Sequence, residues 1–455
     1  MNSITGKLSR FICGLSYDQI PATTILKIKM SLLDTLGCAI SGSDFTCSKS
    51  VNEFVRSQQG IQEATLWTTD FKGPAANVVL GNGTMVHSFD FDDYYNEAKI
   101  HPSAPVIPAA IAIAEKEHAD GKTLLTAIVA GIETMTHIGK GINSSASRTR
   151  GWHLTGTCGT FGAAAAAGRI LNFDVNTMVS ALGMAGTQSA GLWAFTADGS
   201  ESKRFHPGRA AQSGIIAAAL SQLGYLGPSM IIEAHDGGFF KATSDDYDFQ
   251  TVTEGLGEQF DSDKIGIKPH AACASLHSSV DAALLIKNEH NIVIDDISEI
   301  NVYNSKIVNL QCGFEYRPMG ALQAQMSMKY CIARALMDGM LFVNQFSREK
   351  LSDPAVLDLA KRVHFVFDEE IDNIYPKEFP SIVEIIMKKG KNYKTRIDMP
   401  RGSQQNPLSW QDVQEKFSRM TEPLIGGEKI AAIMETVENI ETIKETNTIA
   451  ALLAK

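Results

Sequence analysis

The stretch GTFGAAAAAGRIL, residues 159–171, decides the fold class of this chain. Alanine has the highest helix propensity of all residues, so a run of five alanines strongly favours a helix. Its side chains are small enough for a neighbouring helix to approach closely. The stretch therefore predicts a helix in the interior of a helical domain.

Apolar residues recur at helical spacing on both sides of this stretch. The expected helices are Ile25–Ile40, Val106–Glu117, Leu124–Ile138, Val179–Ala185 and Ala210–Leu223. Strand-like alternation is nearly absent before residue 266. We therefore expect residues 1–265 to form one all-helical domain.

The pattern changes after residue 265. Ser298–Asn309 partly alternates and is rich in β-branched residues, as a strand would be. Residues 382–387 and 393–397 predict a hairpin that turns at Gly390. Further helices are expected at Ser275–Asn288, Gln323–Met337 and Ala355–Val363.

These segments predict a compact α+β domain over residues 266–396. Residues 397–455 return to amphipathic helix, which we expect to pack back on the helical domain. The predicted fold class is therefore mainly α, a large all-helical domain with a smaller α+β domain.

The net charge of the chain argues against nucleic acids and anionic membranes as binding partners. The chain has 455 residues, with 41 Lys and Arg against 51 Asp and Glu, for a net charge of −10. Nucleic-acid binders and binders of anionic membranes usually carry the opposite sign. An anionic small molecule would have to be bound by a few locally placed cations.

The cysteines do not follow a disulfide or zinc-finger spacing, because they are scattered, odd in number and never form CxxC. They are Cys13, Cys38, Cys47, Cys158, Cys273, Cys312 and Cys331. The first 19 residues also lack the apolar core and cleavage site of a signal peptide. A reducing, cytoplasmic location is expected.

Two uncharged stretches are long enough to cross a bilayer, Val175–Ala197 and Ala210–Ile232. Both are rich in Gly, Ser, Thr and Gln, and no cluster of cations marks one side. Closely packed interior helices explain them better than a membrane span.

The first candidate site is HSFDFDDYYNEAKIHPS, residues 87–103, which follows Gly-Asn-Gly at 81–83, where we expect regular structure to break. A carboxylate can orient a histidine ring and stabilise its cation, so Asp90 or Asp93 with His101 predicts an acid–base pair. Carboxylate and imidazole ligands for a metal are a second interpretation. A solvated acidic loop is the third.

Two more candidate sites follow in the helical domain. RGWHLTGTCGT, residues 150–160, places His153 in a glycine-rich helix entry, where exposed amides favour anions. A histidine with a purely structural hydrogen bond in a helix-start loop explains this stretch equally well. DGSESKRFHPGR, residues 198–209, brings Lys203 and Arg204 between two uncharged stretches. Cations there need an anionic partner, either a bound carboxylate or Asp198 or Glu201.

The fourth candidate is KPHAACASLH, residues 268–277, at the change of pattern. A domain boundary is a common place for a ligand cleft, although on spacing alone a polar linker explains the stretch better. The phosphate-loop, serine-hydrolase, zinc-protease and dinucleotide-binding motifs are absent. The residues favour proton chemistry on a carboxylated small molecule.

Motifs in order along nearly the whole chain resemble the MmgE/PrpD family, which includes 2-methylcitrate dehydratase, cis-aconitate decarboxylase and iminodisuccinate epimerase. The motifs are LLDTLGC (32–38), ANVVLGNG (76–83), FDFDD (89–93), HPS (101–103), GWH (151–153), SKRFHPGRAA (202–211), KPHAACASLH (268–277) and QMSMKY (325–330).

The resemblance implies an all-helical domain with an α+β lid, an active site between them and a homodimer. It implies a reaction without metal or cofactor on a small polycarboxylate, with no nucleic-acid or membrane partner. The positions that match the family's active site are Asp90, His101, His153, Lys203 and Lys268.

A mechanism follows from these matches. Lys203 and Lys268, with Arg204, would bind carboxylates and stabilise a carbanion-like state. His101 or His153 would remove a proton alpha to a carboxylate, and the other would act as the acid. Asp90 would orient His101. We also expect Asp93 and Tyr94 to contact the substrate.

The expected function is that of a lyase, a dehydratase or decarboxylase of a citrate- or aconitate-like acid. Tyr94 stands where the decarboxylase branch has threonine, and the short stretch from Asp93 to His101 is more similar to the epimerase. An epimerase of a dicarboxylate such as iminodisuccinate is therefore the first alternative. A non-catalytic metabolite-binding protein is the second.

Overall fold

The computed structural model describes residues 3–375 and 378–455, and its chain divides into two units. The helical unit comprises the residues up to 88 together with 92–267 and 409–455. The α+β unit comprises Phe89–Phe91 and Lys268–Leu408. The division after residue 267 lies close to the change of sequence pattern, and the chain returns to the helical unit after residue 408.

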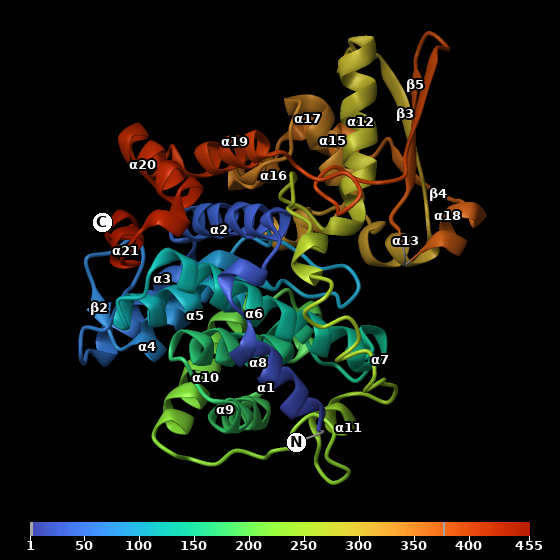
Figure 1. The fold of residues 1–455 in the computed structure, drawn as a ribbon. Coiled ribbons are helices and arrows are strands. Elements are labelled where there is room, and N and C mark those ends of the chain that lie inside the picture. Colours follow the sequence, from blue (N-terminus) through green and yellow to red (C-terminus); the bar gives the residue numbers. More distant parts are fainter. Residues whose placement is uncertain (1–2, 376–377) are drawn as a thin grey trace. The chain divides into compact units, whose positions relative to one another are not determined.

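The helical unit is built almost entirely of helices, as expected (Figure 1). Only two two-residue strands, β1 (Ala64–Thr65) and β2 (Lys72–Gly73), interrupt them among its described residues. The helices are α1 (Ile4–Gly14), α2 (Ala22–Gly42), α3 (Thr46–Gln58), α4 (Ala75–His87), α5 (Ser103–Lys116), α6 (Gly121–Gly141), α7 (Ser144–Thr149), α8 (Leu154–Ile170), α9 (Val175–Gln188), α10 (Ser202–Gln222), α11 (Phe239–Thr243), α19 (Trp410–Thr421), α20 (Gly427–Glu438) and α21 (Asn447–Leu453).

Helix α8, which contains the alanine run, lies in the core of the helical unit and packs against α5, α6, α9 and α10 (Figure 1). Ala163–Ala167 are fully buried. A Cβ on Gly214 of α10 would lie 2.6 Å from Cβ of Ala163, so the two helices approach as closely as the small residues allow. The predicted interior helix is confirmed.

The C-terminal helices belong to the helical unit, where α19 packs against α2. Lys416 of α19 and Asp34 of α2 form a buried ion pair with an Nζ–Oδ1 distance of 2.6 Å. Removing one partner of such a pair would leave a buried charge without compensation. This pair therefore fixes where the C-terminal helices dock.

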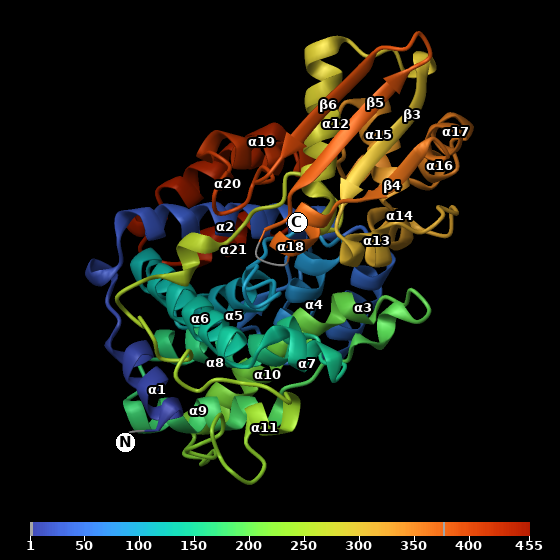
Figure 2. The same cartoon turned by 90° about the vertical axis from the view of Figure 1, so that its right-hand side faces the viewer.

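The α+β unit contains a four-stranded mixed sheet with the strand order β4-β3-β5-β6 (Figure 2). β3 pairs parallel to β4 and antiparallel to β5, and β5 pairs antiparallel to β6. Its elements are α12 (His277–His290), β3 (Ile297–Asn304), α13 (Lys306–Cys312), α14 (Ala321–Gln325), α15 (Met328–Asp338), α16 (Arg348–Leu351), α17 (Pro354–Ala360), β4 (Val363–Phe367), α18 (Glu369–Ile374), β5 (Ser381–Met387) and β6 (Asn392–Ile397).

Helices α12 and α15 pack on one face of this sheet and on each other (Figure 2). The predicted hairpin is confirmed as β5–β6, with Gly390 in the turn at φ 78°. The strand expected over Ser298–Asn309 ends at Asn304, because Ser305 Oγ caps α13 by accepting from the Val308 amide. The end of the helix expected over Ala355–Val363 is wrong, since Val363 begins β4.

Candidate functional site

The loop that carries His153 is held by pairing with a distant segment of the helical unit. Trp152 forms a β-bridge with Leu192, and the His153 amide donates to the Gly191 carbonyl at 2.9 Å. His153 then occupies the N-cap of α8, and its ring is almost fully buried. The ring contacts Trp193 and Phe195, with centroid distances of 5.2 and 5.8 Å.

Helices α4 and α10 bring two further parts of the site together. A Cβ on Gly83 would lie 2.7 Å from Cα of Gly208, so their backbones touch where both residues lack side chains. His87 lies at the end of α4, while Lys203 and His206 lie in the first turns of α10. The expectation that Gly81–Gly83 breaks regular structure is wrong, because these glycines lie inside α4 and allow the close crossing.

His87 and Asp92 form a buried imidazole–carboxylate pair. Nδ1 of His87 lies 2.9 and 3.0 Å from the two carboxylate oxygens, and neither side chain is exposed. The His101 ring lies against His87 with a centroid distance of 4.6 Å, and its Nδ1 is 3.5 Å from Asp92 Oδ2. The carboxylate of Asp92 therefore lies beside both the His87 and the His101 imidazole.

The backbone of Asp93 determines which nitrogen of His101 carries the proton. Nδ1 of His101 donates to the Asp93 carbonyl at 2.7 Å, and the His101 amide donates to Thr155 Oγ1 at 3.1 Å. In the neutral ring this leaves Nε2 as the basic nitrogen. The side chain is 13% exposed, so the ring is oriented but not sealed off.

The Asp93 side chain is buried and held by Ser103, whose hydroxyl and amide donate to the carboxyl group at 2.5 and 3.3 Å. Burial, together with the charge of Asp92, raises the pKa of Asp93 to about 8 despite these hydrogen bonds. The carboxyl is therefore mostly protonated at neutral pH. Its contact with substrate stays a prediction.

His153 and His206 contact each other through their Nδ1 atoms, which lie 2.9 Å apart. Burial, with Lys203, His87, His206 and His101 nearby, holds the pKa of His153 well below its usual range. Burial, with His87 and Lys203, lowers the pKa of His206 to about 4. Both rings are therefore neutral at physiological pH.

Lys203 is close enough to both rings to depress their pKa values. Arg204 lies beside it and pairs with Glu201, with an Nη1–Oε1 distance of 2.8 Å. Of the two anionic partners expected for Arg204 from the sequence, a bound carboxylate or an acidic neighbour, the structure shows the neighbour Glu201. Substrate binding by Lys203 and by Arg204 stays a prediction.

The structure thus gathers the predicted residues His101, His153 and Lys203 in the helical unit. The structure adds three residues, His87, Asp92 and His206. They lie in the same sequence segments but were not among the predicted site residues. The only sequence signal for the first two was their place in HSFDFDD, and for the third its place in KRFHPGR.

The other predicted residues, Asp90 and Lys268, pair within the α+β unit. Lys268 is buried, and its Nζ donates to the Asp90 carbonyl at 2.7 Å and to its carboxylate at 3.0 Å. Asp90 has a φ of 54°, a left-handed conformation that is unfavourable for a non-glycine residue. This strain is typical of functional segments, although the proposed roles of both residues stay predictions.

Tyr94 is placed by a β-bridge to Gly266 in the helical unit. Its amide donates to the Gly266 carbonyl at 2.9 Å, and the Gly266 amide donates back at 2.8 Å. A Cβ on Gly266 would lie 2.4 Å from the Tyr94 ring, so glycine makes room for the ring. Substrate contact by Tyr94 stays a prediction.

A metal would compete with hydrogen bonds already present in the histidine cluster. His87, Asp92 and His101 offer ligand atoms within 4.8 Å of one another. However, Nδ1 of His87 already donates to Asp92, and Nδ1 of His101 donates to a carbonyl. The contacts favour the acid–base interpretation of this segment over the metal interpretation.

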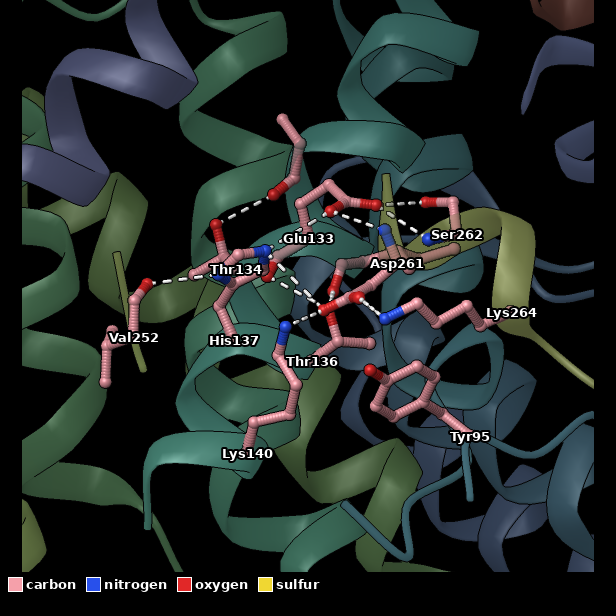
Figure 3. Close-up of polar contacts among 12 residues, drawn as sticks. Tyr95, Glu133, Thr134, Thr136, His137, Lys140, Val252, Asp261, Ser262 and Lys264 are labelled. Carbon is pink, nitrogen blue, oxygen red and sulfur yellow. Dashed lines mark hydrogen bonds and ion pairs between the residues drawn. The ribbon is translucent and has the colours of Figure 1, made fainter. Parts of the chain in front are cut away.

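A second buried polar cluster joins α6 to the 3₁₀ turn Asp261–Lys264 (Figure 3). Nε2 of His137 lies 3.6 Å from Glu133 and 3.5 Å from Asp261, while its Nδ1 donates to the Val252 carbonyl at 3.1 Å. The Lys140 ammonium lies 2.5 Å from the same Asp261 oxygen.

These contacts fit a structural role better than a metal site. Glu133 accepts hydrogen bonds from the Asp261 amide and from the Ser262 amide and hydroxyl. Although burial raises it, the hydrogen bond and charge of Lys140 hold the pKa of Asp261 below its usual range. Lysine thus supplies the positive charge that a metal ion would bring.

Among the described residues, no helix is both long and apolar enough to span a membrane.

Similarity to known proteins extends over the whole chain. It is 27% identical over 476 residues to the cis-aconitate decarboxylase-like protein oryM of Aspergillus oryzae, covering 99% of this chain and 97% of that protein. It is 26% identical to cis-aconitate decarboxylase of Aspergillus terreus over 485 residues, covering 99% and 96%. It is also 26% identical to the human cis-aconitate decarboxylase over 472 residues, covering 100% and 95%.

Family models match in the order that the motifs predicted. The MmgE/PrpD N-terminal domain matches residues 6–252, and the MmgE/PrpD C-terminal domain matches residues 270–442. The chain therefore belongs to the MmgE/PrpD family.

Proposed function

We propose that this protein is a lyase that breaks a bond next to a carboxylate in a citrate- or aconitate-like acid, using its own side chains as acid and base. The observation that carries the proposal is the convergence of His87, His101, His153 and Lys203 in one unit. Imidazoles beside a cation suit proton transfer on an anionic substrate.

His101 is the proposed base. Because its Nδ1 donates to the Asp93 carbonyl, its Nε2 is the atom that accepts a proton from the substrate carbon. Asp92, whose carboxylate oxygen lies 3.5 Å from Nδ1 of His101, stabilises the resulting imidazolium. Its contact with His87 holds this carboxylate in place.

His153 is the proposed acid. In a dehydration, the electron pair of the broken C–H bond forms the double bond, and the hydroxyl leaves as water with a proton from His153. In a decarboxylation, the C–C bond to the departing carboxylate breaks, CO₂ leaves, the bonding electrons pass to the carbon skeleton, and His153 donates a proton to that skeleton. A neutral, buried imidazole is a suitable electrophile for either step.

Two helix N-termini and Lys203 supply the positive potential for the substrate carboxylates. His153 occupies the N-cap position of α8, and Lys203 is the second residue of α10. Helix N-termini attract anions, and a fixed ammonium group adds a full charge. The resemblance assigns Lys268 to the binding of a substrate carboxylate and Asp90 to the orientation of His101, and both assignments are part of the proposal.

Among lyase reactions, the names of the relatives favour decarboxylation. Epimerisation is the second candidate, because Tyr94 occupies the position where the decarboxylase branch has threonine. Both reactions begin with a carbanion-like state, so the shared acid–base residues serve either one. The substrate and the bond that breaks are therefore questions for an assay.

The decisive experiment incubates the purified full-length protein in D₂O with a panel of polycarboxylates. CO₂ release or new alkene absorbance supports the lyase, whereas deuterium uptake without either product identifies an epimerase. No change with any polycarboxylate would contradict both and favour a binding protein. The His101→Gln variant provides the inactive reference, and His364→Gln, which alters an exposed histidine of β4, is the matched control.

A further inference from the structure

The proposed mechanism assigns no role to the imidazole of His206. His206 lies in the first turns of α10, and its side chain has a hydrogen-bond partner in Nδ1 of His153, at 2.9 Å from its own Nδ1. Two neutral imidazoles can form this contact only if one nitrogen carries a proton and the other presents its lone pair. The tautomers of the two rings are therefore coupled.

The His206 ring is held in position by residues that lack side chains. A Cβ on Gly191 would lie 3.3 Å from Nδ1 of His206, and a Cβ on Gly156 would lie 3.3 Å from its Cβ. The His153 amide is bonded to the carbonyl of the same Gly191. One short segment thus positions both rings, so the contact between their Nδ1 atoms is part of the local structure.

The surroundings of the pair favour neutral rings. Lys203, His87 and His101 face His153, and His87 and Lys203 also act on His206. Burial and these neighbours lower the pKa of both imidazoles, as described above. Only one of the two Nδ1 atoms can therefore carry a proton. If that proton is on His206, Nε2 of His153 is a donor, and if it is on His153, Nε2 of His153 is an acceptor.

We propose that His206 donates its Nδ1 proton to Nδ1 of His153 and thereby keeps the proton of His153 on Nε2. This inference rests on the proposed function, because His101 already presents a lone pair as the base. With the opposite tautomer, both catalytic imidazoles would present lone pairs and neither would be an acid. His206 is thus a positioning residue that makes His153 a proton donor.

The test reads the tautomer directly by NMR of the full-length protein labelled with ¹⁵N-histidine. The His153 signals are assigned by their loss in His153→Gln. In His206→Asn the side-chain amide can still donate from the position of Nδ1, whereas His206→Leu removes donor and acceptor at similar volume. His364→Asn is the control for an exposed histidine.

We expect His153 to carry its proton on Nε2 in the wild type and in His206→Asn, and to show mixed tautomers in His206→Leu. We expect kcat to fall by about 10- to 100-fold in His206→Leu, with KM within about 2-fold, and to be largely retained in His206→Asn. A general loss of structure would instead change both constants and the whole spectrum.

A wild-type His153 protonated on Nδ1 would overturn the inference, as would a tautomer that is unchanged in His206→Leu. The spectra also separate this inference from the proposed function. If no polycarboxylate reacts but the Nε2 proton of His153 still depends on His206, the tautomer assignment stands and the lyase proposal fails.

Discussion

Gly83 of α4 and Gly208 of α10 meet where their helices cross, and a Cβ on Gly208 would lie 2.3 Å from the Leu80 carbonyl oxygen. No side chain can be added there without moving a backbone. Because α4 ends at His87 and α10 begins near His206, this crossing sets the positions of both imidazoles.

We predict that Gly208→Ala lowers the free energy of unfolding by about 1–3 kcal/mol, the usual cost of overpacking a core. The measurement is denaturant unfolding followed by circular dichroism. Gly427→Ala in α20 is the control, since a Cβ there meets nothing within 4 Å. Equal stability of both variants would contradict the close crossing.

His101→Gln should lower kcat by at least about 100-fold, because glutamine keeps polarity but cannot take up a proton. The fold should be unchanged, since the glutamine side chain can still donate a hydrogen bond. Steady-state kinetics and circular dichroism together check this prediction. A variant with a wild-type rate would remove His101 from the role of base.

Lys203→Ala should lower kcat/KM by about 100-fold, or about 2.7 kcal/mol, through loss of a fixed cation beside the reacting carboxylate. Arg204→Ala should have a smaller effect, because the Arg204 guanidinium is paired with Glu201. Arg209→Ala, an exposed cation of the same helix, serves as the control. Equal losses in all three variants would point to a general electrostatic effect.

Asp93→Asn should make stability less dependent on pH. The pKa of Asp93 is raised from 3.8 to about 8 in the native state, so between these values the native protein holds a proton that the unfolded chain has released. This contribution therefore lowers wild-type stability as pH rises through that window, by up to about 1.4 kcal/mol per pH unit.

The asparagine variant lacks this titration but resembles the protonated carboxyl in shape. Its stability relative to wild type should consequently increase from pH 5 to pH 8. Urea unfolding at several pH values measures the difference. A difference that is constant or decreases with pH would show that Asp93 is ionised in the native state.

Dialysis against EDTA should leave turnover unchanged. The nitrogens of His87 and His101 that face Asp92 already take part in hydrogen bonds, and Lys140 already neutralises Asp261 in the second polar cluster. Activity that disappears on dialysis and returns with a divalent cation would contradict the proposed acid–base mechanism.

The sequence by itself determined the helical character and pointed to the segments that hold the candidate residues. Small residues such as Ala163–Ala167 leave few alternatives to closely packed helices, and the hairpin at Gly390 follows from local turn chemistry. The motifs also singled out His101, His153 and Lys203, which lie together in the helical unit. These signals are local, so they are readable without knowing the contacts between distant residues.

Tertiary structure alone decided how these segments meet. β4 became a strand because β3 offers it a parallel partner, although its residues adjoin a helical pattern. Gly81–Gly83 remained helical because another glycine-bearing helix crosses there. The pairing of His153 with His206, 53 positions away, depends on the crossing and pairing of distant segments, and no local pattern encodes that distance.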